Sequence, residues 1–389
     1  MLLSLAYMLL GGMFAGWICK KIHLPSLLGM ILVGILLGPH MGNWIDDSIL
    51  NISAELRKIA LIIILLRAGL SLNMKDLKKV GRPAILMCFV PACFEIVGMV
   101  LIAPRLFSIS MIEAAIMGAV VAAVSPAVIV PKMIKLMEEG YGVLKGIPQL
   151  ILAGASVDDV FVIVIFTALT GVLKGGDMSF VQLIRVPISI LLGVVIGCIM
   201  GYVLTICFEK LHIRDSEKII LILSIAFILV TMEDRLENTV PFSGLIAVMV
   251  LGITLQGKRK EVAQRLSAKC SRLWVPAEIL LFVLVGATVD VRYARMEGYK
   301  GILLILLVLV FRMVGVWCCM IKTVLTRKER LFCMFAYTPK ATVQAAIGGI
   351  PLAMGFNCGN LVLTIAVLAI LITAPMGAFV IDASYKKLL

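Results

Sequence analysis

The chain is a succession of long apolar runs separated by short polar or Gly/Pro-containing breaks. A helix needs roughly 20 apolar residues to cross the hydrocarbon core of a bilayer. The breaks define thirteen runs of about this kind, and no stretch between them is long enough to form a soluble domain. We therefore expect an all-α polytopic membrane protein with about 13 transmembrane helices.

The predicted spans lie near residues 2–19, 24–38, 54–72, 82–103, 111–136, 148–173, 183–208, 218–233, 239–256, 273–289, 300–322, 331–354 and 359–381. The longest polar stretch, residues 256–272, is predicted to be a loop.

Composition excludes several other classes of protein. The chain is 61% hydrophobic and only 15% charged, whereas soluble domains are about half apolar and about a quarter charged. The net charge of +13 is spread over short loops, so we expect membrane lipids and no nucleic acid as partners. The ten cysteines show no paired CxxC spacing, which argues against a zinc site or a disulfide framework. No cofactor is expected.

The distribution of basic residues predicts the orientation in the membrane. Of the 36 lysines and arginines, 24 lie in or beside the loops after odd-numbered spans or in the C-terminal tail, and 9 lie after even-numbered spans. Loops rich in lysine and arginine stay in the cytoplasm. We expect a cell-membrane protein with its N-terminus outside and its C-terminus in the cytoplasm.

Two adjacent acids, Asp158 and Asp159, stand near the middle of the sixth span, in GASVDDVFVIVIF. Ionisable residues inside a membrane are costly and usually functional. Neighbouring positions diverge by about 100° around a helix, so one carboxylate can face a cavity while the other faces protein. Such a pair can carry a proton or a small cation, and the two ions compete for it.

Single charges of opposite sign lie in the middle of two other spans. Glu95 is in the fourth span and Arg312 is in the eleventh. Because an unpaired buried charge is expensive, we expect a salt bridge between them that holds the spans together.

Two spans carry prolines that should interrupt the helix. The fifth contains AVSPAVIVPKM, with Pro126 and Pro131, and the twelfth contains YTPKATVQAAIGGIP, with Pro339, Lys340 and Pro351. Proline removes a backbone donor and clashes with the preceding turn. Irregular backbone at membrane depth is tolerated where it lines a cavity or is buried in protein, so both breaks are candidate site elements.

The broken spans are seven apart and therefore cross the membrane in opposite directions. Paired interrupted spans in two halves of a chain are typical of inverted-repeat transporters. Facing half-helix ends present opposed partial charges. We expect Lys340 and Thr342 to compensate charge at the second break. We expect the Ser125 hydroxyl to neutralise the amide ends of the half-helix or to contact a bound ion.

Several long motifs resemble the monovalent cation/proton antiporter superfamily, and most closely its sodium/hydrogen exchanger subfamily B branch, the NHA-type antiporters. These motifs are VSPAVIVPKM, EEGYGVLKGIPQLILAGASVDD, FAYTPKATVQAAIGGIPLA and IALIIILLRAGLSLNMKDLKK. The resemblance runs over nearly the whole chain.

This resemblance implies a homodimer that exchanges sodium or lithium for protons by an elevator-like movement. It implies a dimerisation domain of residues 1–80 and 209–299, a mobile core of residues 81–173 and 300–389, and a linker helix of residues 174–208. Asp159 matches the ion- and proton-binding acid and Asp158 its partner. Glu95 and Arg312 match the acid–arginine pair of the core, and Lys340 the lysine of the second broken helix.

Two positions differ from many relatives. Val124 and Ser125 stand before Pro126 where many relatives have Thr-Asp, which implies ion ligation at this break by backbone carbonyl or by the Ser125 hydroxyl. Arg312 stands where many electrogenic relatives have lysine.

The hypothesis from the sequence is secondary antiport of Na⁺ or Li⁺ against H⁺, with the aspartate pair as the shared site and no enzymatic activity. A K⁺/H⁺ antiporter and a broken-helix organic-anion symporter are alternatives within transport. An intramembrane aspartyl protease would need two carboxylates that share a proton, whereas adjacent aspartates on one helix diverge. A channel or an ion-efflux system gated by nucleotide would be expected to carry a cytoplasmic binding domain with GxGxxG after a strand, whereas only a few residues follow the last predicted span.

Overall fold

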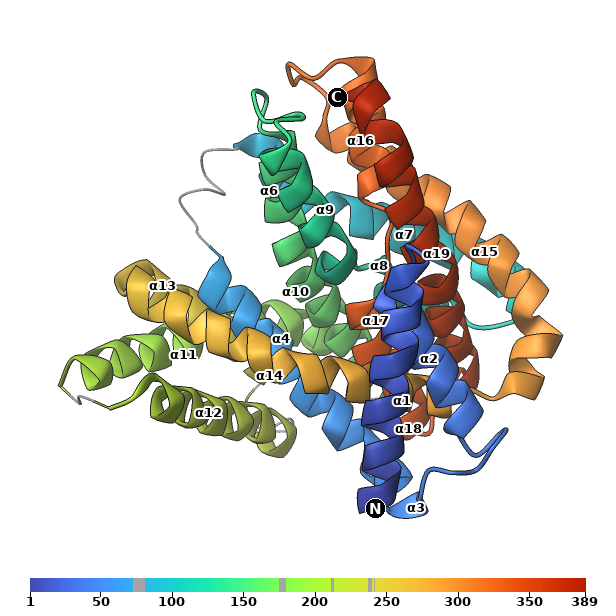
Figure 1. Ribbon diagram of the computed structural model, residues 1–389, viewed down its shortest axis with the longest axis horizontal. Helices are drawn as coiled ribbons and strands as arrows, with labels where there is room; N and C mark the ends of the chain where they lie inside the picture. Colours follow the sequence, from blue (N-terminus) through green and yellow to red (C-terminus); the bar gives the residue numbers. More distant parts are fainter. Residues whose placement is uncertain (73–80, 175–179, 211–212, 237–239, 241) are drawn as a thin grey trace. The chain divides into compact units, whose positions relative to one another are not determined.

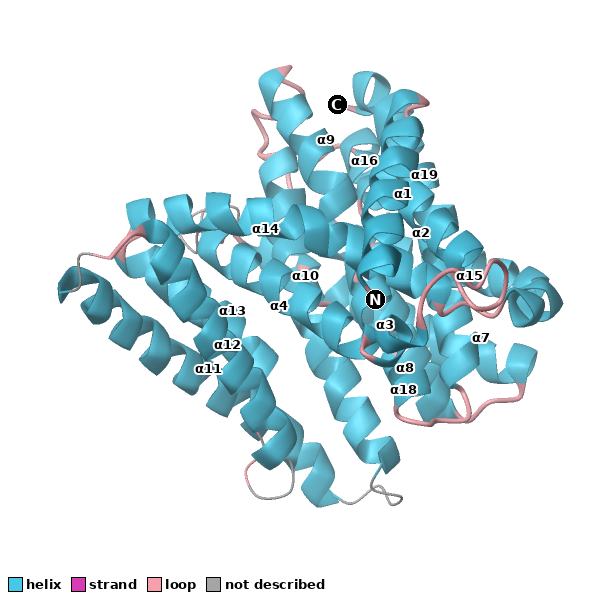
Figure 2. Ribbon diagram, turned by 60° about the horizontal axis from the view of Figure 1, so that its bottom comes forward, coloured by secondary structure: helices cyan, strands magenta, loops and turns pink. Residues whose placement is uncertain are grey.

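The computed structural model describes residues 1–72, 81–174, 180–210, 213–236, 240 and 242–389. These residues form helices and loops only, with no strand among them (Figure 2). Residues 73–79 of the last motif above, residues 175–179 of the predicted linker helix and position 239, where the ninth span was expected to begin, lie outside the described residues.

Eight helical stretches of the described chain are long and apolar enough to cross a membrane: Leu2–Lys21, Arg82–Phe107, Met111–Glu138, Ile147–Leu173, Ile188–Lys210, Lys260–Ala287, Met296–Cys319 and Gly359–Leu388. Three shorter apolar helices are Ser26–Leu37, Gly244–Lys258 and Thr342–Ala353. The described residues are therefore helical, with spans typical of a membrane protein, while the count of thirteen spans stays a prediction.

The chain divides into two compact units, which are described separately. The first comprises Met1–Ala54, Asp76–Thr170 and Ile279–Leu389, and the second Glu55–Lys75 and Gly171–Glu278. The predicted split into a dimerisation domain and a core follows other boundaries and stays a prediction.

The first unit contains the following helices, whose labels appear in Figure 1. They are α1 (Leu2–Lys21), α2 (Ser26–Leu37), α3 (Asp47–Asn51), α6 (Arg82–Met87), α7 (Val90–Phe107), α8 (Met111–Ala122), α9 (Pro126–Glu138), α10 (Ile147–Lys174, up to Thr170), the end of α14 (Lys260–Ala287), α15 (Val291–Cys319), α16 (Arg327–Ala336), α17 (Thr342–Ile347), α18 (Ile350–Ala353) and α19 (Gly359–Leu388).

Both proline-containing spans are interrupted in this unit. The first opens at Ala123–Ser125, where the backbone of Ala123 and Ser125 is extended, and Pro126 starts α9. Pro131 lies inside α9 without ending it. The second opens at residues 337–341, between α16 and α17. Non-helical backbone at both breaks releases carbonyl and amide groups that a continuous helix would pair.

Close helix contacts in the first unit depend on glycine. A Cβ on Gly34 of α2 would lie 2.0 Å from the carbonyl oxygen of Val283 in α14, and one on Gly286 would lie 2.2 Å from that of Ile31. The two backbones therefore touch directly. Small residues at such crossings are typical of membrane helices, where close backbone packing drives association.

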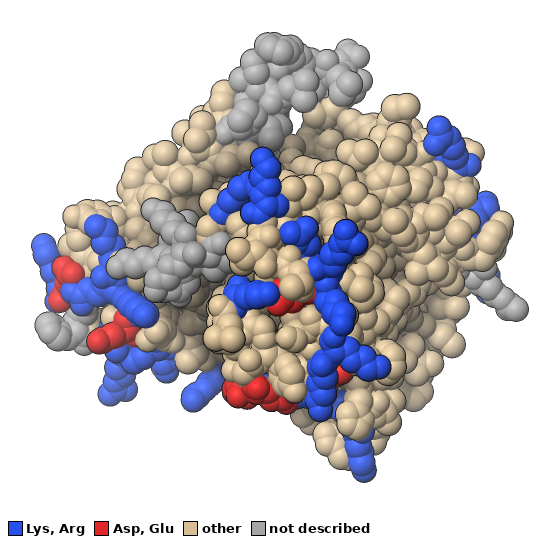
Figure 3. Space-filling model, turned by 90° about the horizontal axis from the view of Figure 1, so that it is seen from above, with Lys and Arg blue, Asp and Glu red and all other residues tan. Residues whose placement is uncertain are grey.

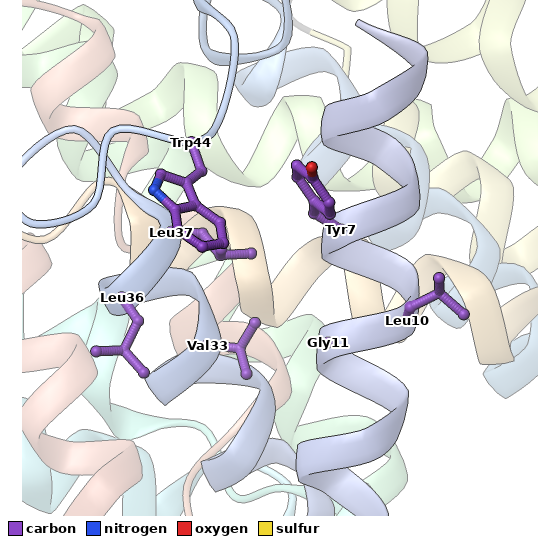
Figure 4. Close-up of a pocket in the computed structure, with 7 residues that line it drawn as sticks. All are labelled: Tyr7, Leu10, Gly11, Val33, Leu36, Leu37 and Trp44. Atoms are coloured by element: carbon purple, nitrogen blue, oxygen red, sulfur yellow. The ribbon is translucent and has the colours of Figure 1, made fainter.

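An apolar groove of about 280 Å³ lies beside α1 and α2 (Figure 4). Tyr7 and Trp44 stand at one end of it, with their ring centroids 5.9 Å apart. The other lining residues are Leu10, Gly11, Val33, Leu36 and Leu37. None of these side chains carries a charge, so the groove is not a candidate ion site.

The second unit comprises most of α4 (Ser53–Ser71), α11 (Phe180–Lys210), α12 (Asp215–Leu236), α13 (Gly244–Lys258) and the first part of α14. The prediction that residues 256–272 form a loop is wrong, because α13 continues to Lys258 and α14 begins at Lys260. Val262, Ala263, Leu266 and Cys270 recur at helical spacing and are buried in the core of this unit. The high charge of the stretch hides this apolar stripe in a hydropathy profile.

Candidate functional site

The two broken spans meet inside the first unit. The backbone N–H of Ser125 at the first break donates to the carbonyl oxygen of Pro339 at the second, at 2.8 Å. The intramembrane charges predicted from the sequence gather around this point. Of the side chains, Arg312 and Lys340 are fully buried, and Glu95 is 1% exposed.

Arg312 of α15 is the centre of the network. Its Nη1 donates to Glu95 Oε2 at 2.8 Å, its Nη2 to Asp158 Oδ2 at 2.9 Å, and its Nε to the carbonyl oxygen of Tyr337 at 2.7 Å. Nη1 also donates to the carbonyl oxygen of Ala122. Ala122 ends α8 and Tyr337 follows the end of α16. One guanidinium therefore pairs with two carboxylates and serves the negative ends of both broken helices, a use suited to its rigid fork of donors.

Lys340 lies within the second break. Its Nζ donates to Glu95 Oε2 at 2.7 Å, and its backbone N–H donates to Thr373 Oγ1 of α19 at 3.0 Å. The ammonium thus contacts the same carboxylate oxygen as Arg312. Its expected role in compensating charge at the helix ends stays a prediction, because the Lys340 ammonium donates to the Glu95 carboxylate.

The two aspartates of α10 differ in their surroundings. Asp158 is fully buried, and its Oδ2 accepts the Arg312 bond and a bond from the backbone N–H of Val124 at 2.8 Å. Val124 lies just before the start of α9, so the carboxylate compensates the positive end of that half-helix. Asp159 is 8% exposed and has no ion pair with any residue that the structure describes.

Charge is balanced within this network except at Asp159. Glu95 and Asp158 carry two negative charges, and Arg312 and Lys340 carry two positive charges, linked in series by the ion pairs Lys340–Glu95, Glu95–Arg312 and Arg312–Asp158. A buried charge is tolerated when it is paired and hydrogen-bonded. Asp159 is a further carboxylate beside this network, and a single positive charge would neutralise it.

Unsatisfied oxygen atoms mark the same region. Within the described residues, Ser125 Oγ, Thr342 Oγ1, Gln344 Oε1 and one oxygen of each aspartate are buried without a hydrogen-bond partner. Most buried polar atoms have a partner, so such atoms call for an explanation. Hydroxyl, amide and carboxylate oxygens are the ligands that hard cations prefer. In the described part of the chain, no group of three or more His, Cys, Asp or Glu could hold a resident metal ion.

Sequence reasoning missed three residues that hold the site together. Tyr337 Oη donates to the carbonyl oxygen of Met87 at 3.0 Å, and the Arg312 guanidinium lies 5.0 Å from the centre of the Tyr337 ring. Thr373 Oγ1 accepts a hydrogen bond from the backbone N–H of Lys340. The Gln344 side chain donates to two carbonyl oxygens at the end of α8. The only signal for Gln344 and Thr373 is that each is a polar residue within a predicted membrane span.

The chain is similar to known proteins over most of its length. The family model described as "Sodium/hydrogen exchanger, transmembrane" matches residues 7–383. Sodium/hydrogen exchanger 9B2 of Mus musculus is 34% identical over 378 residues, which cover 92% of this chain and 67% of that protein. Human sodium/hydrogen exchanger 9B2 is 32% identical over 385 residues, which cover 94% and 70%.

A solved structure has the same fold. The structure of the sodium proton antiporter MjNhaP1 from Methanocaldococcus jannaschii at pH 8 superposes with a TM-score of 0.87, covering 99% of this chain and 97% of that one. The two sequences are 20% identical. This likeness concerns the fold alone.

Proposed function

Because the chain belongs to the sodium/hydrogen exchanger family, we propose that it exchanges Na⁺ or Li⁺ for H⁺ across the membrane, with Asp159 and Asp158 as the shared site. Its relatives are exchangers, so the protein is a membrane transporter and not an enzyme. The observation that carries the proposal is Asp159, a buried acid with no ion pair among the described residues, beside a network of two paired acids and two bases.

The chemistry follows from the neighbouring atoms. The Asp159 carboxylate takes either a proton or a partly dehydrated Na⁺ or Li⁺. The unpartnered oxygens of Ser125 and Asp158 and the backbone at Val124 supply further ligands at the first break. Asp158 is held in place by Arg312 and by the Val124 amide. Proton and cation compete for the same carboxylate, which couples their movements in opposite directions.

Charge balance supports exchange of one proton for one monovalent cation. With the four paired charges unchanged, the site is neutral when Asp159 holds H⁺ or Na⁺ and carries one negative charge when it is empty. A net charge is costly to move through a low-dielectric region. The site therefore moves between the two sides of the membrane when Asp159 holds H⁺ or Na⁺, and it does not move when Asp159 is empty. This gives alternating access and an electroneutral exchange cycle.

The wider architecture belongs to the same proposal. Helices α4 and α12 would complete a set of thirteen spans in an inverted repeat with two broken crossing helices. The core of residues 81–173 and 300–389 would move against residues 1–80 and 209–299 of a homodimer, with residues 174–208 as the linker. The face seen from above in Figure 3 is rich in lysine and arginine, and the orientation with the C-terminus in the cytoplasm rests on the basic loops.

The test is transport by the purified protein in proteoliposomes. An outward cation gradient is imposed, proton movement is followed with a pH-sensitive dye, and Na⁺, Li⁺ and K⁺ are compared with and without a clamped membrane potential. We expect Na⁺- and Li⁺-dependent proton movement that is insensitive to the potential and is lost in Asp159→Asn.

Asp290→Asn is the matched control, because asparagine also caps a helix well and Asp290 caps α15 outside the site. It should transport at the wild-type rate. Undiminished proton movement in Asp159→Asn refutes the site, and a K⁺-driven flux without a Na⁺ or Li⁺ flux favours the K⁺/H⁺ alternative. A rate that changes with the potential refutes the one-for-one stoichiometry.

A further inference from the structure

Gln344 is a fully buried glutamine on α17, in the helix that follows the second break. Its Nε2 donates to the carbonyl oxygen of Val121 at 3.0 Å and to that of Ala123 at 2.8 Å. Both acceptors belong to the end of α8 at the first break. The last carbonyls of a helix have no hydrogen-bond donor within that helix. Gln344, from the second broken span, supplies this donor to the carbonyls at the end of α8 in the first.

Arg312 completes the set of bonds at this helix end. It donates to the carbonyl oxygen of Ala122, the residue between the two acceptors of Gln344. Three successive carbonyls are therefore held by two side chains from other elements. The next residue, Val124, donates its N–H to Asp158, and Ser125 donates to the second break.

Glutamine is specifically suited to this position. A side-chain amide has two N–H donors, and both acceptors are contacted through the one nitrogen. Glutamate would replace these donors with acceptors facing carbonyl oxygens. Leucine or methionine would leave buried carbonyls unsatisfied, which is costly. Asparagine is one methylene shorter and would not span the same gap.

We propose that Gln344 is a positioning residue for the transported cation. By holding residues 121–123 against α17, it fixes the backbone that leads directly into Val124 and Ser125, where ligand oxygens for the cation lie. Its own Oε1 is buried without a hydrogen-bond partner within the described structure. This oxygen is therefore a free acceptor where the two broken spans meet. This inference rests on the proposed function, since it concerns the geometry of the same ion site.

The experiment measures the apparent KM for Na⁺ and the maximal rate separately in proteoliposomes. Gln344→Met keeps the length of the side chain and removes its donors. Gln256→Met, at a buried glutamine of α13 in the other unit, is the matched control. Loss of a residue that orients ion ligands typically weakens ion binding about 10- to 100-fold, so we expect a rise of that size in KM for Gln344→Met and none for Gln256→Met.

A merely structural role gives a different result. It would lower the amount of active protein and hence the maximal rate, with KM unchanged, and that outcome overturns the proposal. Gln344→Asn keeps an amide, and it takes the place of the methionine variant if the latter is not recovered folded. If the variant that is recovered folded has the wild-type KM for Na⁺, the positioning role of Gln344 is likewise refuted.

The proposal fails separately from the proposed function. If Asp159→Asn abolishes transport while Gln344→Met keeps the wild-type KM, only the role of Gln344 is refuted. If Asp159→Asn transports normally, the site itself is wrong.

Discussion

Replacing Glu95 with glutamine should be strongly destabilising, and replacing Lys340 as well should restore much of the loss. Glu95 Oε2 lies 2.8 Å from Arg312 Nη1 and 2.7 Å from Lys340 Nζ, and all three side chains are at most 1% exposed. In Glu95→Gln, Arg312 keeps Asp158 at 2.9 Å. Lys340 then has no carboxylate partner within the described residues.

The magnitude follows from what each variant leaves buried. Breaking a buried ion pair by removing one partner costs about 3–5 kcal/mol, because the other charge stays uncompensated. Glu95→Gln should lose about that much of the free energy of unfolding. In the double variant with Lys340→Met, the surplus charge is gone and the glutamine oxygen still accepts from Arg312. The sum of the two single losses should therefore exceed the loss in the double variant by at least about 2 kcal/mol.

The assay is reversible unfolding in mixed micelles of the wild type, both single variants and the double variant, analysed as a double-mutant cycle. Lys132→Met with Asp382→Asn, a partly exposed pair between α9 and α19, is the reference cycle and should give a coupling of about 1 kcal/mol or less. Losses at Glu95 and Lys340 that add within about 0.5 kcal/mol would refute the shared-carboxylate network.

Three further predictions concern single contacts. Tyr337→Phe removes the hydroxyl that donates to Met87, and should lower the free energy of unfolding by about 1 kcal/mol in the same assay. Burial alone would raise the pKa of Glu329, but hydrogen bonds from Lys145 and from the α16 N-cap lower it from its ordinary 4.5. The stability that this gives is present above pH 4.5 and is lost as the pH falls through the lowered pKa, so Lys145→Gln should lose less stability than the wild type on acidification in a thermal unfolding series. Gly34→Ala places a Cβ 2.0 Å from a backbone oxygen of α14 and should destabilise by about 3 kcal/mol or more, measured by unfolding.

Each of these has an outcome that contradicts it. Unchanged stability in Tyr337→Phe would mean that the carbonyl finds another donor. Identical acid profiles for the wild type and Lys145→Gln would remove the ion pair with Glu329 as the cause. Gly298→Ala, where a new Cβ meets nothing within 4 Å, is the control for Gly34→Ala. Equal effects of the two alanines would show that close backbone approach at Gly34 is not limiting.

The sequence predicts the helical membrane architecture and the positions of the charges because both depend on local properties. Apolar runs and isolated intramembrane charges can be identified residue by residue. The prolines likewise mark the breaks, since their effect is on their own backbone. The class of fold and the location of the candidate site can therefore be predicted from the sequence.

Most of the ion-pair partners of these charged residues could not be predicted from the sequence. That Asp158 pairs with Arg312, and that Lys340 shares Glu95, depends on the packing of α7, α10 and α15, which hydropathy does not encode. The stretch 256–272 was mistaken for a loop because its charges mask an apolar stripe that is visible only at helical spacing. The interruption of the predicted fourth span between α6 and α7 has no strong sequence signal beyond Pro91, which also fits the first turn of a helix.

The dependence on Arg312 has a consequence for the synthesis of the protein. Glu95 precedes Arg312 by 217 residues, and Asp158 precedes it by 154. Domains are made from the N-terminus onward, so α7 and α10 emerge from the ribosome well before the guanidinium that both acids require. Biogenesis of the first unit is thus completed only after α15 and the second broken span have been translated. A chain truncated before residue 312 would contain both acids but could not assemble this core.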